Sequence, residues 1–203
     1  VAKGEKYTPF ASLPNKAIVD NSITFKAVSK SFGLAAQKFA WFFSTNKTLL
    51  ERVKKNVRAD INTLGAVANL GALRGGEEWF NQCNEYIDGN QAFAVDYIAR
   101  NIPSIKTAKP QGTYLLWLDF TAVATKIDLK KLTADANMGR GSGEMDLTPE
   151  AVLQRYIIKN AKVNLNPGHT YGKGGQNHMR MNLGTSRQLV KKALDNIAKA
   201  VNG

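Results

Sequence analysis

The sequence predicts an α/β fold in which a strand-and-helix unit precedes a smaller α+β unit. Two short apolar runs come first, two long helical patterns follow, and the remainder mixes short strand and helix patterns. The 203 residues are 43% hydrophobic and 22% charged, which is the composition of an ordinary globular protein. No apolar run reaches the roughly 18 residues that a transmembrane helix needs.

The two apolar runs, residues 23–29 and 38–45, are short enough to be strands buried on both faces of a sheet. Residues 1–22 contain Pro9 and Pro14 and show few periodic apolar positions, so we expect them to be irregular.

Two helices are expected next. Asn46 can cap a helix whose apolar residues recur at steps of three and four, until Gly71 and the pair Gly75-Gly76 break the pattern. These apolar positions are Leu50, Val53, Val57, Ile61, Leu64 and Ala68. A second helix is expected over 77–101, ending before Pro103. The single cysteine, Cys83, excludes an internal disulfide and is expected to be a buried structural thiol on this helix.

The second half of the chain alternates short elements. We expect a strand over 112–119, a helix over 128–136, a glycine-containing flexible loop over 138–145 and a helix that begins at Thr148 and Pro149. Strands are expected over 162–165 and 178–183, and a final helix begins at Thr185 or Ser186. The boundary between domains is placed in the helix over 77–101, which gives a first domain of residues 1–90 and a second of residues 91–203.

The net charge of +12 and the pI near 9.8 raise the question of nucleic-acid binding. The basic residues are dispersed over exposed helix positions, and no zinc-finger spacing or arginine-rich arm is present. His169 and His178 have no third ligand at metal-binding spacing. We therefore expect neither a nucleic-acid partner nor a metal site.

Lys30 follows the first apolar run and is flanked by Ser29 and Ser31. A lysine amine that is partly desolvated at a strand end loses its proton easily and can form a Schiff base with an aldehyde cofactor. Lys38, eight residues later, is a second cation that can hold the phosphate of such a cofactor. The alternative is that a Ser-Lys-Ser-Phe segment occurs here by chance.

Arg180 lies inside an otherwise apolar strand pattern. A buried guanidinium is costly without an anion, and arginine binds a carboxylate through two parallel hydrogen bonds. The residue-level alternatives are a substrate carboxylate and an internal salt bridge to Asp or Glu.

Four segments occur together in one order. They are the Lys30 segment over 27–38, the strand Gly-Thr-Tyr-Leu-Leu-Trp-Leu-Asp over 112–119, the Asn-Pro-Gly turn at 166–168 with its following glycines, and Arg180, which lies 150 residues after Lys30. In these segments the chain resembles the class I/II aminotransferase superfamily of pyridoxal-phosphate enzymes (fold type I), and within it the cystathionine β-lyase-like subgroup. The resemblance implies the C-terminal part of that fold: a remnant of the large-domain sheet with helices, then a small α+β domain.

The resemblance implies a role for each site residue. Lys30 would bind pyridoxal 5'-phosphate covalently and act as the catalytic base, Lys38 and Ser29 would contact the phosphate, and Arg180 would bind the α-carboxylate of an amino-acid substrate. Ala27, where many aminotransferases have a phosphate-binding serine, favours the β-lyase-like subgroup.

The activity that this implies is β-elimination at a C–S bond, with transamination to a 2-oxo acid as the alternative. A different class remains open, a basic non-catalytic binding domain or an inactive fragment. The resemblance also implies a homodimer. A cytoplasmic location without a membrane partner is expected from the single cysteine and the lack of a long apolar run.

The chain departs from the family in what precedes Lys30. The family's phosphate loop, stacking aromatic residue, cofactor-contacting Asn and pyridine-binding Asp all lie far before the lysine, whereas only 29 residues precede Lys30. Neither Glu5 nor Asp20 is placed to contact the pyridine nitrogen. The chain is therefore expected to correspond to roughly the C-terminal half of such an enzyme.

Overall fold

The computed structural model describes residues 1–57, 60–138, 140–141 and 143–203. These residues divide into two compact units, which we call the N-terminal unit (Gly4–Asn84) and the C-terminal unit (Val1–Lys3 with Glu85–Gly203). The division falls within helix α4 (Glu77–Asn101), the helix in which the sequence places the domain boundary, but before residue 90. Among the described residues, no helix combines the length and hydropathy that a membrane crossing needs.

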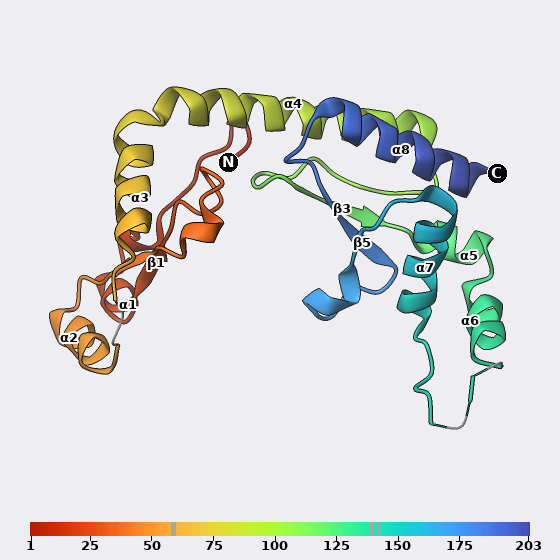
Figure 1. The fold of residues 1–203 in the computed structure, drawn as a ribbon, viewed down its shortest axis with the longest axis horizontal. Coiled ribbons are helices and arrows are strands. Elements are labelled where there is room, and N and C mark those ends of the chain that lie inside the picture. The colour runs from red at the N-terminus through yellow and green to blue at the C-terminus, as the bar shows by residue number, and fades with distance from the viewer. Residues whose placement is uncertain (58–59, 139, 142) are drawn as a thin grey trace. The chain divides into compact units, whose positions relative to one another are not determined.

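The N-terminal unit consists of short elements joined to two longer helices (Figure 1). In chain order they are η1 (Phe10–Ser12), α1 (Lys16–Asp20), β1 (Thr24–Lys26), η2 (Ala35–Gln37), β2 (Trp41–Phe43), α2 (Lys47–Asn56), α3 (Thr63–Gly75) and the first two turns of α4. Strands β1 and β2 form an antiparallel pair in which Phe25 lies opposite Phe42, with ring centroids 5.7 Å apart.

The expectation of two strands buried on both faces is wrong. β1 and β2 have three residues each and pair only with one another among the described residues, so each strand is an edge strand. Phe25 is 68% exposed and Phe43 is 40% exposed, although they lie on opposite faces of the pair. Within the described residues of this unit, neither face of the pair is fully covered, so the apolar runs do not become a buried core here.

The single helix expected from Asn46 to residue 68 is two helices. The Asn46 side chain accepts a hydrogen bond from the backbone N–H of Leu49 (3.0 Å), which confirms the predicted cap. Val57 is extended and ends α2, and the side chain of Asn62 caps α3 in the same way. Gly71 lies inside α3 and does not break it. Residues 58 and 59, between the two helices, lie outside the described residues.

The C-terminal unit contains a three-stranded antiparallel sheet in the order β3-β5-β4. Its strands are β3 (Leu115–Asp119), β4 (Asn166–Pro167) and β5 (His178–Asn182). Its helices, besides the second part of α4, are α5 (Thr121–Lys126), α6 (Leu129–Met138), α7 (Pro149–Ala161), η3 (Gly168–Tyr171) and α8 (Arg187–Asn202).

One face of this sheet forms the core of the unit. The strand residues on that face are fully buried and pack with apolar residues of α4, α7 and α8. They are Leu116, Leu118, Met179 and Met181. Figure 1 shows α8 lying along the second part of α4, and the Tyr97 hydroxyl of α4 donates a hydrogen bond to Asp195 of α8 at 2.5 Å. The final helix is confirmed, and its buried apolar residues recur at steps of three and four: Val190, Leu194, Ile197 and Val201.

Most predicted elements of this unit are present with shifted ends, and the final helix is capped by Ser186. One prediction is wrong: residues 162–165 do not form a strand. Lys162 adopts a left-handed conformation (φ 56°) that caps α7, and the sheet is joined instead at Asn166–Pro167. Helix α5 was not predicted. The glycine loop expected over 138–145 lies partly outside the described residues, at Gly139 and Ser142.

Candidate functional site

The turn that carries Lys30 follows β1 directly. The backbone N–H of Phe32 donates to the carbonyl of Val28 at 3.0 Å, and Val28, only 4% exposed, anchors the turn. Ser29 is half-buried and Lys30 is exposed. Within the described residues, the expectation of a partly desolvated amine is therefore wrong, because Lys30 lies on a turn beyond the strand rather than within a covered sheet.

Phe32 fixes the far end of this turn. Its ring stacks on Trp79 with centroids 5.7 Å apart and packs against Phe80 at 5.5 Å. Gly76 leaves the space that this ring occupies, since a Cβ at that position would lie 2.5 Å from a ring carbon of Phe32. The lysine is thus exposed, but the turn beneath it is held by packing.

Lys38 lies at the end of η2 rather than on a strand. It adopts a left-handed conformation (φ 51°), and its backbone N–H donates to the carbonyl of Ala35. Its side chain is exposed. In the part of the chain that the structure describes, neither the Lys30 nor the Lys38 ammonium forms an ion pair or a side-chain hydrogen bond.

The chemistry of these side chains suits parts of a pyridoxal-phosphate group. A primary amine such as that of Lys30 can react with an aldehyde carbon, and a second ammonium and a hydroxyl, such as those of Lys38 and Ser29, can bind a phosphate. Asp20 accepts a hydrogen bond from the Thr45 hydroxyl (2.5 Å), so one of its carboxylate oxygens has a partner within the N-terminal unit.

Arg180 belongs to the C-terminal unit, on the sheet face opposite the core. On β5 it lies between Trp117 of β3 and Asn166 of β4. Its guanidinium carbon lies 4.8 Å from the centroid of the Tyr171 ring. Among the described residues, Arg180 forms no ion pair with a carboxylate, so the internal salt bridge considered as an alternative is wrong.

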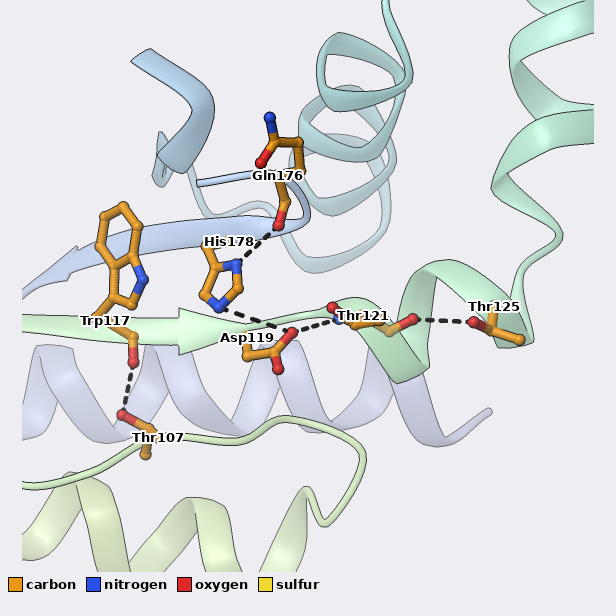
Figure 2. A network of polar contacts seen from close by, with 7 residues as sticks. All are labelled: Thr107, Trp117, Asp119, Thr121, Thr125, Gln176 and His178. Carbon is orange, nitrogen blue, oxygen red and sulfur yellow. Dashed lines mark hydrogen bonds and ion pairs between the residues drawn. The ribbon is translucent and has the colours of Figure 1, made fainter. Parts of the chain in front are cut away.

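A polar network continues along the same sheet face (Figure 2). Asp119 and His178 are cross-strand partners, with 3.9 Å between His178 Nε2 and Asp119 Oδ1. His178 Nδ1 lies 2.7 Å from the carbonyl oxygen of Gln176, and because a carbonyl only accepts, Nδ1 carries the proton. The indole of Trp117 stacks on the imidazole, with centroids 5.7 Å apart.

Asp119 is held in its charged form. Partial burial raises the pKa of this carboxyl, but hydrogen bonds from Thr121 and the charge of His178 outweigh burial and leave the pKa below its usual value. The backbone N–H of Thr121 donates to Asp119 at 2.8 Å. A fixed negative charge therefore lies at one end of the network and the cation of Arg180 at the other.

The sequence analysis missed four members of this surface: Trp117, Asp119, Tyr171 and His178. His178 was considered only as a metal ligand, and no role was assigned to Tyr171. The signal was present for three of them, because residues 117, 119, 178 and 180 alternate with buried residues along paired strands. Tyr171 lies on η3, where no periodic pattern indicates a direction.

A cavity of about 530 Å³ lies at the Thr121 end of this network. It is lined by residues of α5, by the first residues of α6 and α7, and by the two residues that precede β5. Thr125, Asp128 and Glu150 are among the lining residues. None of the four predicted site residues lines it. This cavity is thus separate from the surface around Arg180.

Comparison with known proteins gives concordant matches. A family model described as aminotransferase class I and II matches residues 3–197. A putative cystathionine beta-lyase of Mycobacterium leprae is 28% identical, over 99% of this chain and 47% of that protein. Cystathionine beta-lyase PatB of Bacillus subtilis is 30% identical, over 98% of this chain and 46% of that protein.

A solved structure matches as well. The PLP-bound putative aminotransferase of Clostridium difficile 630 superposes with a TM-score of 0.81 at 30% identity, covering 100% of this chain and 47% of that one. The α/β fold predicted from the sequence is confirmed by this superposition. The chain spans about half the length of the relatives that it matches.

Proposed function

Since the chain belongs to the aminotransferase class I and II family, we propose that the protein is a pyridoxal-phosphate enzyme that cleaves C–S bonds of amino acids by β-elimination. The lyase activity is supported by the relatives named cystathionine β-lyases, which match nearly the whole chain. The single structural observation that carries the proposal is Arg180: among the described residues it forms no ion pair, and an arginine of this kind on the sheet face opposite the core is suited to bind a substrate carboxylate.

We propose that Lys30 links covalently to the cofactor aldehyde and that Lys38 and Ser29 bind its phosphate. The support is that both amines are exposed and that neither has an ion-pair partner among the described residues. Lys30 lies on the turn after β1, and Lys38 lies at the end of the 3₁₀-helix that follows. When bound, pyridoxal phosphate supplies an electron-withdrawing ring that accepts the electron pair left at the substrate Cα.

The residues of this chain then have separate tasks. Arg180 holds the α-carboxylate through its guanidinium edge and so orients the substrate. The Lys30 amine would take up the proton from the substrate Cα. The Cβ–S bond breaks, the sulfur leaves as a thiolate and takes up a proton. With cystathionine and one water, the products are homocysteine, pyruvate and ammonia.

Transamination is the second candidate, because the solved relative at 30% identity is a putative aminotransferase. It would use the same lysine and arginine, and it differs from β-elimination in that the proton taken from Cα is returned to a carbon of the cofactor.

We further propose a homodimer, which agrees with the apolar surface of the N-terminal unit, and a cytoplasmic location, which agrees with a single free cysteine. The assignment of residues 1–90 to a large cofactor domain and 91–203 to a small domain is part of the same proposal.

Product analysis tests the proposal. The protein, supplied with pyridoxal phosphate, is incubated with cystathionine and, in a separate reaction, with an amino acid plus 2-oxoglutarate. We expect pyruvate and ammonia from the first reaction and loss of both with Lys30→Ala. Glutamate from the second reaction without pyruvate from the first would instead assign a transaminase.

A further inference from the structure

The side chains around Arg180 form a continuous chain of ring contacts on the open sheet face. The guanidinium lies over Tyr171 (4.8 Å), and the Tyr171 ring meets Trp117 edge to face, at 5.7 Å and 76°. Trp117 in turn stacks on His178, which Asp119 faces. Arg180 therefore lies over the face of Tyr171, and no carboxylate of the described residues forms an ion pair with it.

The loop that carries Tyr171 closes tightly, although the residue itself is 52% exposed. Gly168 and Gly175 touch where the loop closes: a Cβ on Gly175 would lie 2.1 Å from the carbonyl oxygen of Gly168. Within the loop, Gly172 has a φ of 110°, a conformation that disfavours a side chain. The Asn166 side chain, which belongs to the strand beside Arg180, also donates to the Tyr171 hydroxyl at 3.4 Å.

Stacking on a ring uses the flat face of a guanidinium and leaves its N–H edge free. A long arginine side chain loses rotamer entropy when it is immobilised by a ligand. An arginine already held by a ring loses less on binding a carboxylate. The contact with Tyr171 therefore restricts the Arg180 side chain, and among the described residues no carboxylate forms an ion pair with it.

We propose that Tyr171 is a positioning residue that fixes the guanidinium of Arg180 for carboxylate capture, with Trp117 supporting the ring from its edge. The inference rests on the proposed role of Arg180 as the carboxylate-binding residue. It assigns the effect to the aromatic face of Tyr171 and not to its hydroxyl.

The test compares Tyr171→Leu, which keeps bulk without an aromatic face, with Tyr171→Phe, which keeps the face without the hydroxyl. In steady-state β-elimination of cystathionine, Tyr171→Leu should raise KM about fivefold with kcat within about twofold of the parent. Tyr171→Phe should keep KM within about twofold. In ¹⁵N NMR spectra, the Arg180 Nε–H resonance, identified by its loss in Arg180→Lys, should carry a ring-current shift that Phe retains and Leu removes.

The outcomes separate this inference from the proposed function. If Arg180→Ala raises KM but Tyr171→Leu does not, the inference is wrong and the role of Arg180 stands. Equal increases in KM for Tyr171→Leu and Tyr171→Phe would also overturn it, since the ring face would then not matter. If Arg180→Ala leaves KM unchanged, the carboxylate role fails and the inference fails with it.

Discussion

The two units differ in where their apolar residues lie. The C-terminal unit encloses a contiguous core formed by α4, α7, α8 and one face of the β3-β5-β4 sheet. Among the described residues of the N-terminal unit, the buried apolar side chains are Val19 and Val28. Its helix α3 instead exposes four large apolar side chains, by 46% to 75%: Leu64, Val67, Leu70 and Leu73.

The difference shows that Arg180 and Lys30 are supported by different kinds of packing. Arg180 and its aromatic support are held by strands whose other face is a packed core. Lys30 is held by a local turn, with Val28 beneath it and Phe32 packed on Trp79. Contiguous exposed apolar surface is typical of interaction surfaces, so the N-terminal unit is the part expected to bury further area in an assembly.

Truncation of a core residue should give the largest contrast. Leu118→Ala removes a side chain that is 1% exposed and should lower the free energy of unfolding of the C-terminal unit by about 2–5 kcal/mol. Leu64→Ala, at a residue that is 75% exposed, should change the stability of the isolated chain by less than about 0.5 kcal/mol. Urea denaturation followed by circular dichroism measures both. Equal losses would mean that α3 is packed in solution.

Glycine substitutions sharpen the comparison at the level of the backbone. Gly175→Ala forces a Cβ against the Gly168 carbonyl and should cost about 1–3 kcal/mol, because the loop that carries Tyr171 must shift. Gly71→Ala adds a Cβ with nothing within 4 Å inside α3 and should stabilise that helix by up to about 1 kcal/mol. Thermal unfolding of the two variants shows whether each substitution raises or lowers the stability. A neutral Gly175→Ala would contradict the tight closure of the loop.

A smaller effect concerns alkaline pH and the α4–α8 contact. Burial, then the hydrogen bond to Asp195 and its charge, raise the pKa of Tyr97 from 10.0 to about 12. The resulting stability is fully present below pH 10 and is lost as pH rises from 10 to 12, by at most on the order of 2 kcal/mol. Tyr97→Phe should flatten this part of the stability profile, whereas Tyr7→Phe, at an exposed residue of the N-terminal unit, should not. Matching profiles for Tyr97→Phe and the parent would refute this assignment.

The sequence predicted best where a pattern is local. Helix α8 has a serine cap and a stripe of buried residues, and both are read directly from spacing. The long helix α4 follows from the same periodicity. The burial of the strands over 23–29 and 38–45 was mispredicted. An apolar run indicates that a strand has apolar side chains to bury, but it does not show that the described residues cover them.

The site shows the same limit. Lys30, Lys38, Ser29 and Arg180 were selected by their order and by family resemblance, and the structure adds that Arg180 has no carboxylate partner among the described residues. Tyr171 could not be found from spacing. Its position depends on a close approach of Gly168 and Gly175, which only the folded backbone reveals.

The central claim, that Lys30 is the amine that takes the cofactor, has a direct measurement. The protein is incubated with pyridoxal phosphate, reduced with borohydride, digested, and mapped by peptide mass spectrometry, with Lys38→Ala as the matched control. The expected result is a reduced pyridoxyl group on Lys30 in both proteins, at lower occupancy in the Lys38→Ala protein. A label on other lysines with Lys30 unmodified would contradict the claim.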